Sequence, residues 1–372
     1  MSDALWLEEA LRLAHSARGR TSPNPAVGAV VVRDGAIVGR GWTHPAGSDH
    51  AEVVALREAG ERARGGMLVV TLEPCCHHGR TPPCTDAIIA AGITAVHASM
   101  LDPNPRVAGQ GVAALEAAGI PVRLGDGASE AAEIVRGFRT WIRTGRPFVA
   151  AKFAASLDGK IASQPGVQGW ISSEESRAHA HLVRETLDAI VIGIATAIAD
   201  DPHLTARPGG RFPADGHQPL RVVADSALRL PPSARMLREP GRTLVVHLTG
   251  ASQARAATLA DAGAELLALP ERNGRVDLRA LVEELGRRGA LEVLLEGGGN
   301  LLGSAYDCEI VDFQYAYLAP LIVGGEQAVP AVGGAGVASI ASAHRLVAPT
   351  VERLGRDILV SGWIAGHEGA DV

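Results

Sequence analysis

The chain contains 372 residues, of which 47% are hydrophobic and 20% are charged, and its formal net charge is −6. This length is enough for two domains, and the composition is typical of a globular protein rather than a disordered one. The negative charge and the lack of any block of five Lys or Arg residues argue against duplex binding, so we expect no nucleic-acid partner. No apolar stretch reaches the length of a membrane span, and we expect neither membrane association nor a signal peptide.

The first part of the chain alternates helix and strand patterns. Apolar positions at helical spacing from Leu5 to Ala14 predict a first helix, and residues 26–32 and 37–41 predict a hairpin. The later predicted elements are a helix from residue 50 to about 64, a strand at 67–72, a helix after residue 84, a strand at 94–100, a helix at 110–118 and a strand at 121–124. This alternation predicts a three-layer α/β domain.

A second α/β domain is predicted after a helix at residues 129–144, which Gly145-Arg146-Pro147 ends. We therefore divide the chain into residues 1–146 and 147–372. The predicted strands of the second domain are residues 148–154, 189–193, 220–224, 243–247, 265–269, 291–296, 311–318 and 358–362, with a helix at 173–186. The Gly- and Pro-rich residues 208–219 predict an exposed loop.

The most specific pattern in the chain is His50-Ala51-Glu52, followed by Pro74-Cys75 and then Cys84. One imidazole and two thiolates can hold Zn²⁺ at three positions and leave the fourth open for water, as catalytic zinc sites do. Glu52 is then placed to move protons without being a ligand, and the zinc deaminases of nucleobases use this arrangement. The sequence predicts a zinc site of His50, Cys75 and Cys84, with Glu52 as the catalytic acid and base.

The residues between Cys75 and Cys84 leave alternatives open. Cys76 could replace Cys75 as a ligand, but Cys75 directly follows the proline of the motif. His77 and His78 could also bind metal, although we expect them to contact the substrate side of the loop. The four cysteines do not suggest a disulfide framework, so we expect a reducing compartment and a cytoplasmic protein.

Three motifs in the second domain follow predicted strands. They are residues 152–160, residues 196–207 with the pair Asp200-Asp201, and residues 296–303 with three consecutive glycines. Ligands of open α/β sheets bind at the carboxyl ends of the strands, where glycines let a phosphate approach backbone N–H groups. Each motif alone also fits turn and cap chemistry, and Arg184 and Arg207 could hold a phosphate or be solvated surface charges.

Both halves of the chain together resemble one family, the bifunctional riboflavin-biosynthesis deaminase–reductases. The resemblance covers nearly the whole chain and rests on residues 23–28, 50–53, 71–75, 77–84, 102–105, 156–160, 170–172, 200–202 and 296–298. The eight residues between Cys75 and Cys84, unusual for other zinc deaminases, are characteristic of this family. The resemblance implies a cytidine-deaminase-like three-layer αβα domain followed by a dihydrofolate-reductase-like α/β domain.

The resemblance also implies two consecutive reactions on a phosphorylated pyrimidine. The first domain would deaminate 2,5-diamino-6-(5-phosphoribosylamino)pyrimidin-4-one with zinc, and the second would reduce the ribosyl group to ribityl with NADPH. The implied NADPH contacts are Ala154, Trp170, Thr196, Asp200, Ser226, Gly298, Gly299, Asn300, Leu301, Leu302, Gly303 and Ser304. The implied substrate contacts are Lys152, Gln168, Arg184, Leu204, Arg207 and Glu296 in the reductase domain, and Asn24, His77 and Arg80 in the deaminase domain.

The chain departs from the family pattern at three positions. Gln168 stands where the family usually has Ser, Thr43 where it has His, and Ala29 where it has Cys. Three rival interpretations are a nucleotide or tRNA deaminase with a non-reducing C-terminal domain, a zinc-stabilised binding protein without activity, and a chain whose reductase half is inactive. We also expect a homo-oligomer, the common case for soluble proteins.

Overall fold

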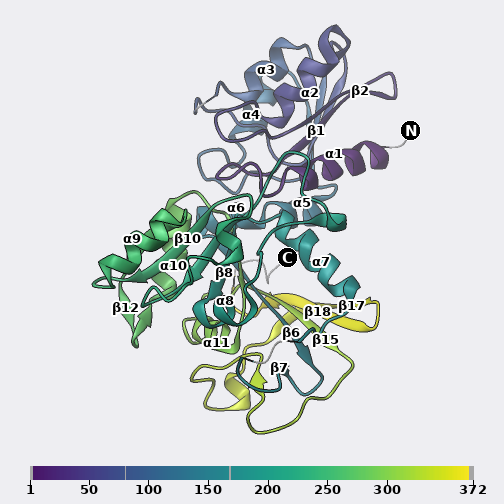
Figure 1. Cartoon of the computed structure of the whole chain (residues 1–372). Coiled ribbons are helices and arrows are strands. Elements are labelled where there is room, and N and C mark those ends of the chain that lie inside the picture. Colours follow the sequence, from purple (N-terminus) through teal and green to yellow (C-terminus); the bar gives the residue numbers. More distant parts are fainter. Residues whose placement is uncertain (1–2, 80, 167–168, 368–372) are drawn as a thin grey trace. The chain divides into compact units, whose positions relative to one another are not determined.

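The computed structural model describes residues 3–79, 81–166 and 169–367. The chain forms two compact units, Met1–Gly145 and Arg146–Val372 (Figure 1). None of the helices within these described ranges is both long and apolar enough to cross a membrane. The predicted substrate contacts Arg80 and Gln168 lie outside the described residues.

The first unit is built on a five-stranded sheet with the order β2-β1-β3-β4-β5. Its strands are β1 (Gly28–Arg33), β2 (Ala36–Trp42), β3 (Met67–Val70), β4 (Ala95–Ala98) and β5 (Val122–Leu124). β1 pairs antiparallel with β2 and with β3, whereas β3, β4 and β5 are parallel. The predicted hairpin is therefore confirmed, and it turns at Asp34 and Gly35, whose φ angles of 49° and 76° are left-handed.

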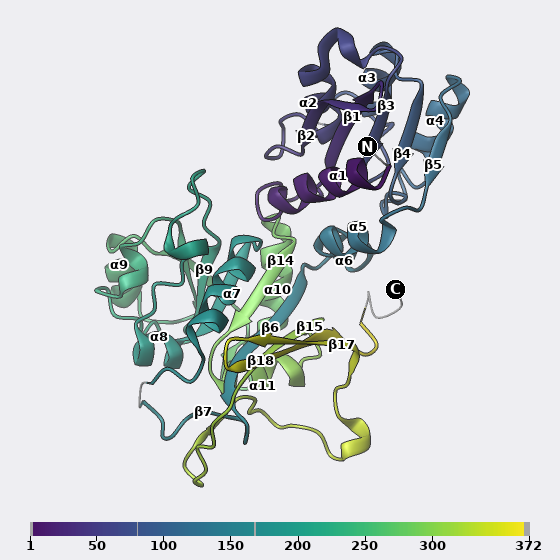
Figure 2. The same ribbon diagram turned by 90° about the vertical axis from the view of Figure 1, so that its right-hand side faces the viewer.

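Helices cover both faces of this sheet (Figure 2). They are α1 (Asp3–Ala17), α2 (Ala51–Ala59) with the short η1 (Gly60–Ala63), α3 (Cys84–Ala90) and α4 (Gln110–Ala117). Because side chains alternate across a strand, Ala29 and Val31 share a core with α2, α3 and α4, whereas Val30 and Val32 share one with α1. The three-layer αβα architecture predicted from the sequence is confirmed.

Two glycines of β2 allow α2 to lie unusually close to the sheet. A Cβ atom at Gly39 would come within 2.2 Å of the Ala55 carbonyl oxygen, and one at Gly41 within 2.1 Å of the Ala51 carbonyl oxygen. No larger residue fits either place without moving the backbone. This close packing fixes the start of α2, which carries His50 and Glu52.

The predicted single helix at residues 129–144 is wrong. The structure has two helices there, α5 (Ala128–Ile134) and α6 (Arg136–Thr144). They are separated at Val135, whose φ of −97° and ψ of 17° leave the helical region. No proline lies near this break, so the sequence pattern did not mark it. Gly145 ends α6 with a left-handed φ of 74°, as its position after the helix predicts.

The second unit is built on a nine-stranded sheet with the order β11-β10-β9-β8-β14-β6-β15-β18-β17. Its strands are β6 (Phe148–Ser156), β8 (Ala189–Gly193), β9 (Leu220–Ala224), β10 (Thr243–Leu248), β11 (Glu265–Leu269), β14 (Glu292–Glu296), β15 (Phe313–Ala319), β17 (Leu346–Leu354) and β18 (Asp357–Ile364). The strands from β11 to β15 in this order are parallel, and β18 is antiparallel to both of its neighbours. The sequence did not predict β17, because most of its side chains are exposed at the sheet edge and show no buried alternation.

Helices cover both faces of the parallel strands. They are α7 (Glu174–Glu185), α8 (Ile194–Asp200), α9 (Gln253–Asp261), α10 (Leu278–Arg287) and α11 (Gly299–Asp307). Val149 and Val191 share one core with α10 and α11, whereas Ala150 and Ile190 share the other with α8 and α9. This burial on both faces explains why the strands read as continuous apolar runs.

Short elements complete the second unit. β7 (Lys160–Ala162) pairs with β16 (Val329–Pro330), β12 (Glu271–Arg272) pairs with β13 (Arg275–Val276), and the 3-10 turns are η2 (Pro208–Gly210), η3 (Arg235–Leu237) and η4 (Ile340–Ser342). The carboxyl ends of β9, β8, β14 and β6, which are neighbours in the parallel sheet, meet at one edge. The motifs predicted for the second domain begin at this edge.

Candidate active sites

The three predicted zinc ligands come together at the starts of two helices. His50 immediately precedes α2, Cys84 is the first residue of α3, and Cys75 lies in the segment after β3. The sulfur atoms of Cys84 and Cys75 lie 3.3 Å and 3.6 Å from His50 Nδ1, and all three ligand atoms lie within 4.8 Å of one another. Two ligands of one tetrahedral zinc ion are about 3.5 Å apart, so these side chains fit the ion.

Hydrogen bonds prepare Cys75 to bind a metal. The Cys84 backbone N–H donates to Cys75 Sγ at 3.4 Å. Hydrogen bonds from Cys84 and His50 lower the pKa of the Cys75 thiol, and the thiolate is the form that ligates zinc. Burial has the opposite effect on the neighbouring Cys76, whose pKa it raises. Among the described residues the metal-ligand cluster contains Cys75 and neither Cys76 nor His77, which favours Cys75 as the ligand.

Glu52 lies in the first turn of α2, and only 4% of it is exposed. Burial raises the pKa of Glu52 to about 7. A carboxyl group that titrates near neutral pH can both accept and return a proton, which is what a general acid–base catalyst requires. The structure thus places a suitable proton carrier two residues from one zinc ligand.

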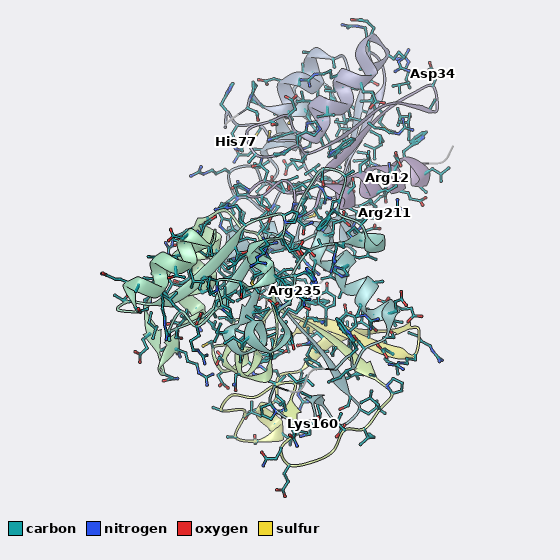
Figure 3. The ribbon with its side chains drawn as sticks, viewed as in Figure 1. Arg12, Asp34, His77, Lys160, Arg211 and Arg235 are labelled. Atoms are coloured by element: carbon teal, nitrogen blue, oxygen red, sulfur yellow. The ribbon has the colours of Figure 1, made fainter. Side chains whose placement is uncertain are left out.

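The other residues predicted for the deaminase domain lie on loops. Asn24 precedes β1. Its backbone N–H donates to the Thr21 carbonyl oxygen at 2.9 Å, and its own carbonyl oxygen accepts a hydrogen bond from the Thr21 hydroxyl at 2.9 Å. His77 is exposed on the loop between the two cysteines (Figure 3). Sequence reasoning missed Thr81 on the same loop, whose hydroxyl lies 3.5 Å from His50 Nε2. Its only sequence signal is its place within the family motif at residues 77–84.

Thr43 and His44 have structural contacts of their own. Thr43 is buried, and its hydroxyl accepts a hydrogen bond from the Val27 backbone N–H at 3.2 Å. The His44 ring lies beside the Trp42 ring, with 5.7 Å between the centroids. These contacts hold the end of β2 and give neither residue a place among the metal ligands of the described chain.

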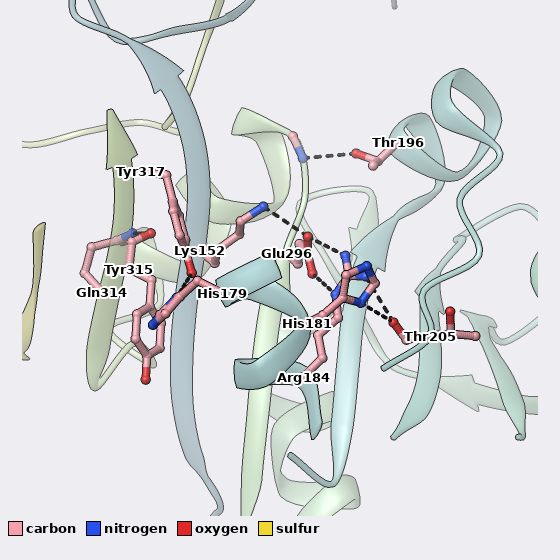
Figure 4. Close-up of polar contacts among 11 residues, drawn as sticks. Lys152, His179, His181, Arg184, Thr196, Thr205, Glu296, Gln314, Tyr315 and Tyr317 are labelled. Atoms are coloured by element: carbon pink, nitrogen blue, oxygen red, sulfur yellow. Dashed lines mark hydrogen bonds and ion pairs between the residues drawn. The ribbon is translucent and has the colours of Figure 1, made fainter. Parts of the chain in front are cut away.

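Glu296 is the centre of a group of charges at the carboxyl end of β14 (Figure 4). Arg184 on α7 donates to it from Nε at 2.9 Å and from Nη2 at 2.7 Å, and Lys152 on β6 donates from Nζ at 3.1 Å. Burial alone would raise the pKa of Glu296, but the charges of Arg184 and Lys152 outweigh burial and hold that pKa well below its usual range. Glu296 is therefore an ionised carboxylate that orients two cations.

Leu204, Thr205 and Arg207 follow α8 and lie beside α7. His181 Nδ1 is 3.1 Å from the Thr205 carbonyl oxygen and 3.3 Å from the Arg207 backbone nitrogen. Burial and the charges of Arg184 and Arg207 lower the pKa of His181 to about 4. Thr205 Oγ1 and Arg207 Nε are buried and have no hydrogen-bond partner among the described residues. Such unpaired groups beside two arginines are suited to a bound anion.

Thr196 connects two of the predicted cofactor motifs. It lies on α8 after β8, and its hydroxyl accepts a hydrogen bond from the Gly298 backbone N–H at 3.0 Å (Figure 4). A Cβ at Gly297 or Gly298 would come within 3.4 Å or 3.3 Å of this hydroxyl oxygen. The Thr196 hydroxyl therefore lies directly against the backbone that leads into α11 and occupies the Gly298 N–H.

Gly299 and Gly303 are in close contact with another segment of the chain. A Cβ at Gly299 would lie 2.4 Å from the Pro330 carbonyl oxygen, and one at Gly303 would lie 2.2 Å from the Gly333 carbonyl carbon. Leu301 and Leu302 point into the core of the second unit. Gly299 and Gly303 thus allow α11 to pack against residues 330–334.

The other predicted cofactor contacts are spread along the sheet edge. Ser226 follows β9, and its hydroxyl accepts a hydrogen bond from the Val276 backbone N–H at 3.1 Å. Ala154 lies near the end of β6 and pairs with Tyr317. Trp170 is 81% exposed, and the Arg177 guanidinium lies 4.8 Å from its ring centroid. The side chains predicted at Asn300 and Asp200 are exposed, and Ser304 is half-buried.

Sequence reasoning missed two residues beside Lys152. The Lys152 ammonium lies 5.5 Å from the ring centroid of Tyr317, and the Tyr317 hydroxyl is 2.8 Å from His179 Nδ1 (Figure 4). Tyr317 belongs to the alternating pattern of β15, and His179 to the helical pattern of α7. Neither pattern distinguishes a residue at a site from one in the core.

Comparison with known proteins identifies the chain. The cytidine and deoxycytidylate deaminase zinc-binding region matches residues 1–100, and the RibD C-terminal domain matches residues 147–360. Riboflavin biosynthesis protein RibD of Escherichia coli is 42% identical over 334 residues, which cover 88% of this chain and 90% of the relative. The same protein of Aquifex aeolicus is 41% identical over 359 residues, covering 96% and 97%. The chain belongs to the RibD family.

Solved structures of RibD proteins also match nearly the whole chain. Acinetobacter baumannii RibD has a TM-score of 0.85 at 35% identity, and the match covers 98% of this chain and 99% of that one. A Thermotoga maritima diaminohydroxyphosphoribosylaminopyrimidine deaminase/5-amino-6-(5-phosphoribosylamino)uracil reductase has a TM-score of 0.83 at 31% identity, covering 97% and 98%. RibD proteins are bifunctional deaminases and reductases of riboflavin biosynthesis.

Membership of the RibD family confirms several predictions. The fold is a cytidine-deaminase-like domain followed by a dihydrofolate-reductase-like α/β domain. His50, Cys75 and Cys84 form the zinc site of the deaminase domain, and the reductase family implies NAD(P)H. The family match extends over both halves, so the chain is not a nucleotide or tRNA deaminase with an unrelated C-terminal domain.

Proposed function

We propose that residues 1–146 deaminate 2,5-diamino-6-(5-phosphoribosylamino)pyrimidin-4-one and that residues 147–372 reduce the ribosyl group of the product to ribityl with NADPH. The observation that carries the proposal is the presence, in one chain, of two different sites. One is a His/Cys/Cys zinc centre with a buried carboxyl beside it, and the other is a sheet edge with Glu296, its two cations and the start of α11 beside Thr196.

In the deamination, the protein's own catalytic group is Glu52. Zinc, when bound, supplies the Lewis acidity that lets water act as a nucleophile at neutral pH. Glu52 takes a proton from the attacking water and delivers it to the 2-amino group. The new bond joins the ring carbon to oxygen, the bond to the amino nitrogen breaks, and ammonia leaves. The pKa of about 7 for Glu52 suits both proton transfers.

Substrate recognition in the deaminase domain falls to the loops around the metal. We assign Asn24, His77 and Arg80 to this role, of which Arg80 lies outside the described residues. Asn24 and the exposed His77 both belong to loops rather than to the core. Loops at strand and helix ends are accessible parts of this fold, and binding residues are frequent there.

In the reduction, side chains at the sheet edge bind and orient the two reactants. NADPH, when bound, would supply the hydride to C1′ of the ribosyl group; the C1′–O4′ bond breaks, and the former ring oxygen takes a proton from solvent to become a ribityl hydroxyl. Thr196, which also accepts the Gly298 N–H, and the residues at the start of α11 hold the cofactor phosphates, with Ala154, Trp170, Asp200 and Ser226 along the same edge. Lys152 and Glu296 orient the pyrimidine, Leu204 supports it, and Gln168 lies outside the described residues.

The substrate phosphate is assigned to Arg207 together with Arg184. Arg184 is already paired with Glu296 through Nε and Nη2, whereas Arg207 Nε is buried without a partner in the described structure. Arg207 is therefore the main phosphate ligand in this proposal, and Arg184 contributes its charge. A planar guanidinium suits a phosphate because it offers two parallel N–H donors.

The test is a paired assay of ammonia release and NADPH oxidation on the purified chain. The diaminopyrimidine phosphate should release one ammonia and then support oxidation of one NADPH. Cytidine and dCMP serve as control substrates and should release none. Turnover of cytidine without NADPH oxidation on any pyrimidine would contradict the proposal. Replacing NADPH with NADH in the same assay tests the choice of cofactor.

Two further expectations stay predictions. We propose that the chain forms a homo-oligomer, which light scattering of the purified protein measures directly. The expected cytoplasmic location follows from the cysteine usage of the chain and is tested by cell fractionation.

A further inference from the structure

Glu73 is a buried carboxylate that neither binds zinc nor carries protons in the proposed reaction. It lies two residues before the ligand Cys75, and only 3% of it is exposed. Three backbone N–H groups donate to its side chain. Asp102 and Gly109 donate to Oε2 at 3.1 Å and 2.9 Å, and Val112 donates to Oε1 at 3.0 Å.

These donors join the first turn of α4 to the metal-binding segment. Gly109 is the N-cap residue of α4 and has no side chain that could accept a hydrogen bond, and Val112 is the third residue of the helix. The first N–H groups of a helix have no partner within the helix, and its N-terminus favours a negative charge. Glu73 therefore supplies the cap that the α4 sequence lacks.

A close backbone contact also holds the first turn of α4 against the segment before Cys75. A Cβ at Gly111 would lie 2.0 Å from the Pro74 carbonyl oxygen and 3.1 Å from Glu73 Oε1. The first turn of α4 thus lies directly on the Pro74–Cys75 peptide. Cys75 is the next residue, and its carbonyl oxygen accepts a hydrogen bond from the Thr85 N–H of α3 at 3.2 Å.

We propose that Glu73 is a positioning residue of the zinc centre, which ties α4 to the segment before Cys75 and thereby aims the Cys75 thiolate at the metal. Cys75 is then held between two helices, by α3 through direct bonds and by α4 through Glu73. The same carboxylate holds the Asp102 N–H, and Asp102 Oδ1 in turn accepts the Asn104 N–H at 2.7 Å. Glu73 thus orders residues 102–104 together with the metal ligand.

An amide cannot replace this carboxylate. Both oxygens of Glu73 accept from N–H donors, whereas the amide group of a glutamine has one oxygen and one NH₂ group. In Glu73→Gln the NH₂ group must face at least one backbone N–H, so one bond is lost and the segment before Cys75 is released. Loss of a group that bonds directly to a metal ligand typically costs about 10- to 100-fold in metal affinity, and we take this range for Glu73, which acts on Cys75 through the backbone.

The experiment compares three variants of the full chain. Glu73→Gln removes the carboxylate, and Gly111→Ala pushes on the Pro74 carbonyl without changing any charge. Glu58→Gln is the matched control, since Glu58 is exposed on α2 and accepts a single backbone N–H, from Arg40 at 3.1 Å. The readouts are the rate of zinc release to a chelator, the visible spectrum of the cobalt-substituted protein, and the melting temperature with and without zinc.

A positioning role predicts about 10- to 100-fold faster zinc release in Glu73→Gln and Gly111→Ala, with a changed cobalt spectrum. The stabilisation by zinc should shrink in both variants, whereas Glu58→Gln should match the unmodified chain. NADPH oxidation by the reductase half of the same chain should not change. The proposal rests on the zinc site, so this result does not depend on which pyrimidine is deaminated.

Three outcomes overturn the proposal. Zinc release and a cobalt spectrum like those of the unmodified chain would show that Glu73 does not position the ligand. An equal loss of melting temperature with and without zinc would assign Glu73 to general stability alone. Failure of both variants to fold, with or without zinc, would also assign Glu73 to general stability, because a positioning residue should leave the metal-free domain folded.

Discussion

Replacing Glu296 with Gln tests the reductase site most sharply by a single change. Glu296 receives three charge-assisted hydrogen bonds, at 2.9 Å and 2.7 Å from Arg184 and at 3.1 Å from Lys152. The side chains of Glu296, Arg184 and Lys152 are only 13%, 15% and 18% exposed. Removing one member of such a buried group costs about 3–5 kcal/mol, because the remaining charges stay buried without their partner.

We expect the lower end of that range, about 3 kcal/mol, because the two cations keep some contact with water and the amide oxygen still accepts. For a domain of this size, each kcal/mol lowers the melting temperature by about 2–4 °C. The pKa of Glu296 is lowered by folding, so its stabilisation is present above the pKa of the unfolded chain and is lost as the pH falls below it. The difference between the two proteins should therefore shrink below about pH 4.

The assay combines calorimetry with NADPH oxidation on the deaminated substrate. Glu296→Gln should lose at least about 100-fold in reduction, since a misplaced orienting group commonly costs that much, while ammonia release stays unchanged. Glu265→Gln is the control, because Glu265 also pairs with an arginine, Arg242 at 2.8 Å, but is 38% exposed. A surface pair contributes at most about 1 kcal/mol. Full reductase activity and normal stability in Glu296→Gln would refute the reasoning.

Three further predictions concern other parts of the chain. Asp312→Asn should destabilise the second unit by about 3–5 kcal/mol in urea unfolding, because the buried Asp312 accepts two bonds of 2.6 Å from Arg146 and one of 2.8 Å from His367; a change under 1 kcal/mol would contradict this. His181 should titrate near pH 4 by NMR, and bound substrate phosphate should raise that pKa by adding negative charge; an unmoved pKa in the complex would place the phosphate elsewhere. Removal of zinc should abolish ammonia release and leave NADPH oxidation on the deaminated substrate intact, so loss of both activities would disprove separate sites.

The zinc centre could be predicted because its chemistry is visible in residue types. His50, Glu52, Cys75 and Cys84 form an uncommon combination at a spacing that few proteins share, and the structure brings the three ligands together. The role of Glu73 could not be predicted in this way. Its donors Asp102, Gly109 and Val112 lie 29, 36 and 39 residues further along the chain, and backbone N–H groups leave no trace in a sequence.

The reductase site shows the same limit over longer distances. The strand ends that carry Lys152 and Glu296 could be predicted from apolar runs, but the pairing of Glu296 with Arg184 joins residues 112 positions apart. Arg184 was predicted as a phosphate contact, and the structure adds that Glu296 already holds its guanidinium. The three glycines at 297–299 were interpreted together, yet Gly299 packs against Pro330, which only the folded chain reveals.

Secondary structure was predicted well where burial is regular and poorly where it is not. The parallel strands of the second unit are buried on both faces and were found as apolar runs. The edge strand β17 was missed because its side chains are mostly exposed. The break at Val135 between α5 and α6 was missed because no glycine or proline precedes it there to interrupt the helical pattern.

Glu52→Gln offers the most direct test of a chain with two successive activities. The variant should keep a full complement of zinc, because Glu52 is not a ligand, and should release almost no ammonia from the diaminopyrimidine phosphate. With that substrate it should oxidise no NADPH, whereas with the already deaminated pyrimidine it should oxidise NADPH at the rate of the unmodified chain. Normal ammonia release, or loss of NADPH oxidation on the deaminated pyrimidine, would contradict the account.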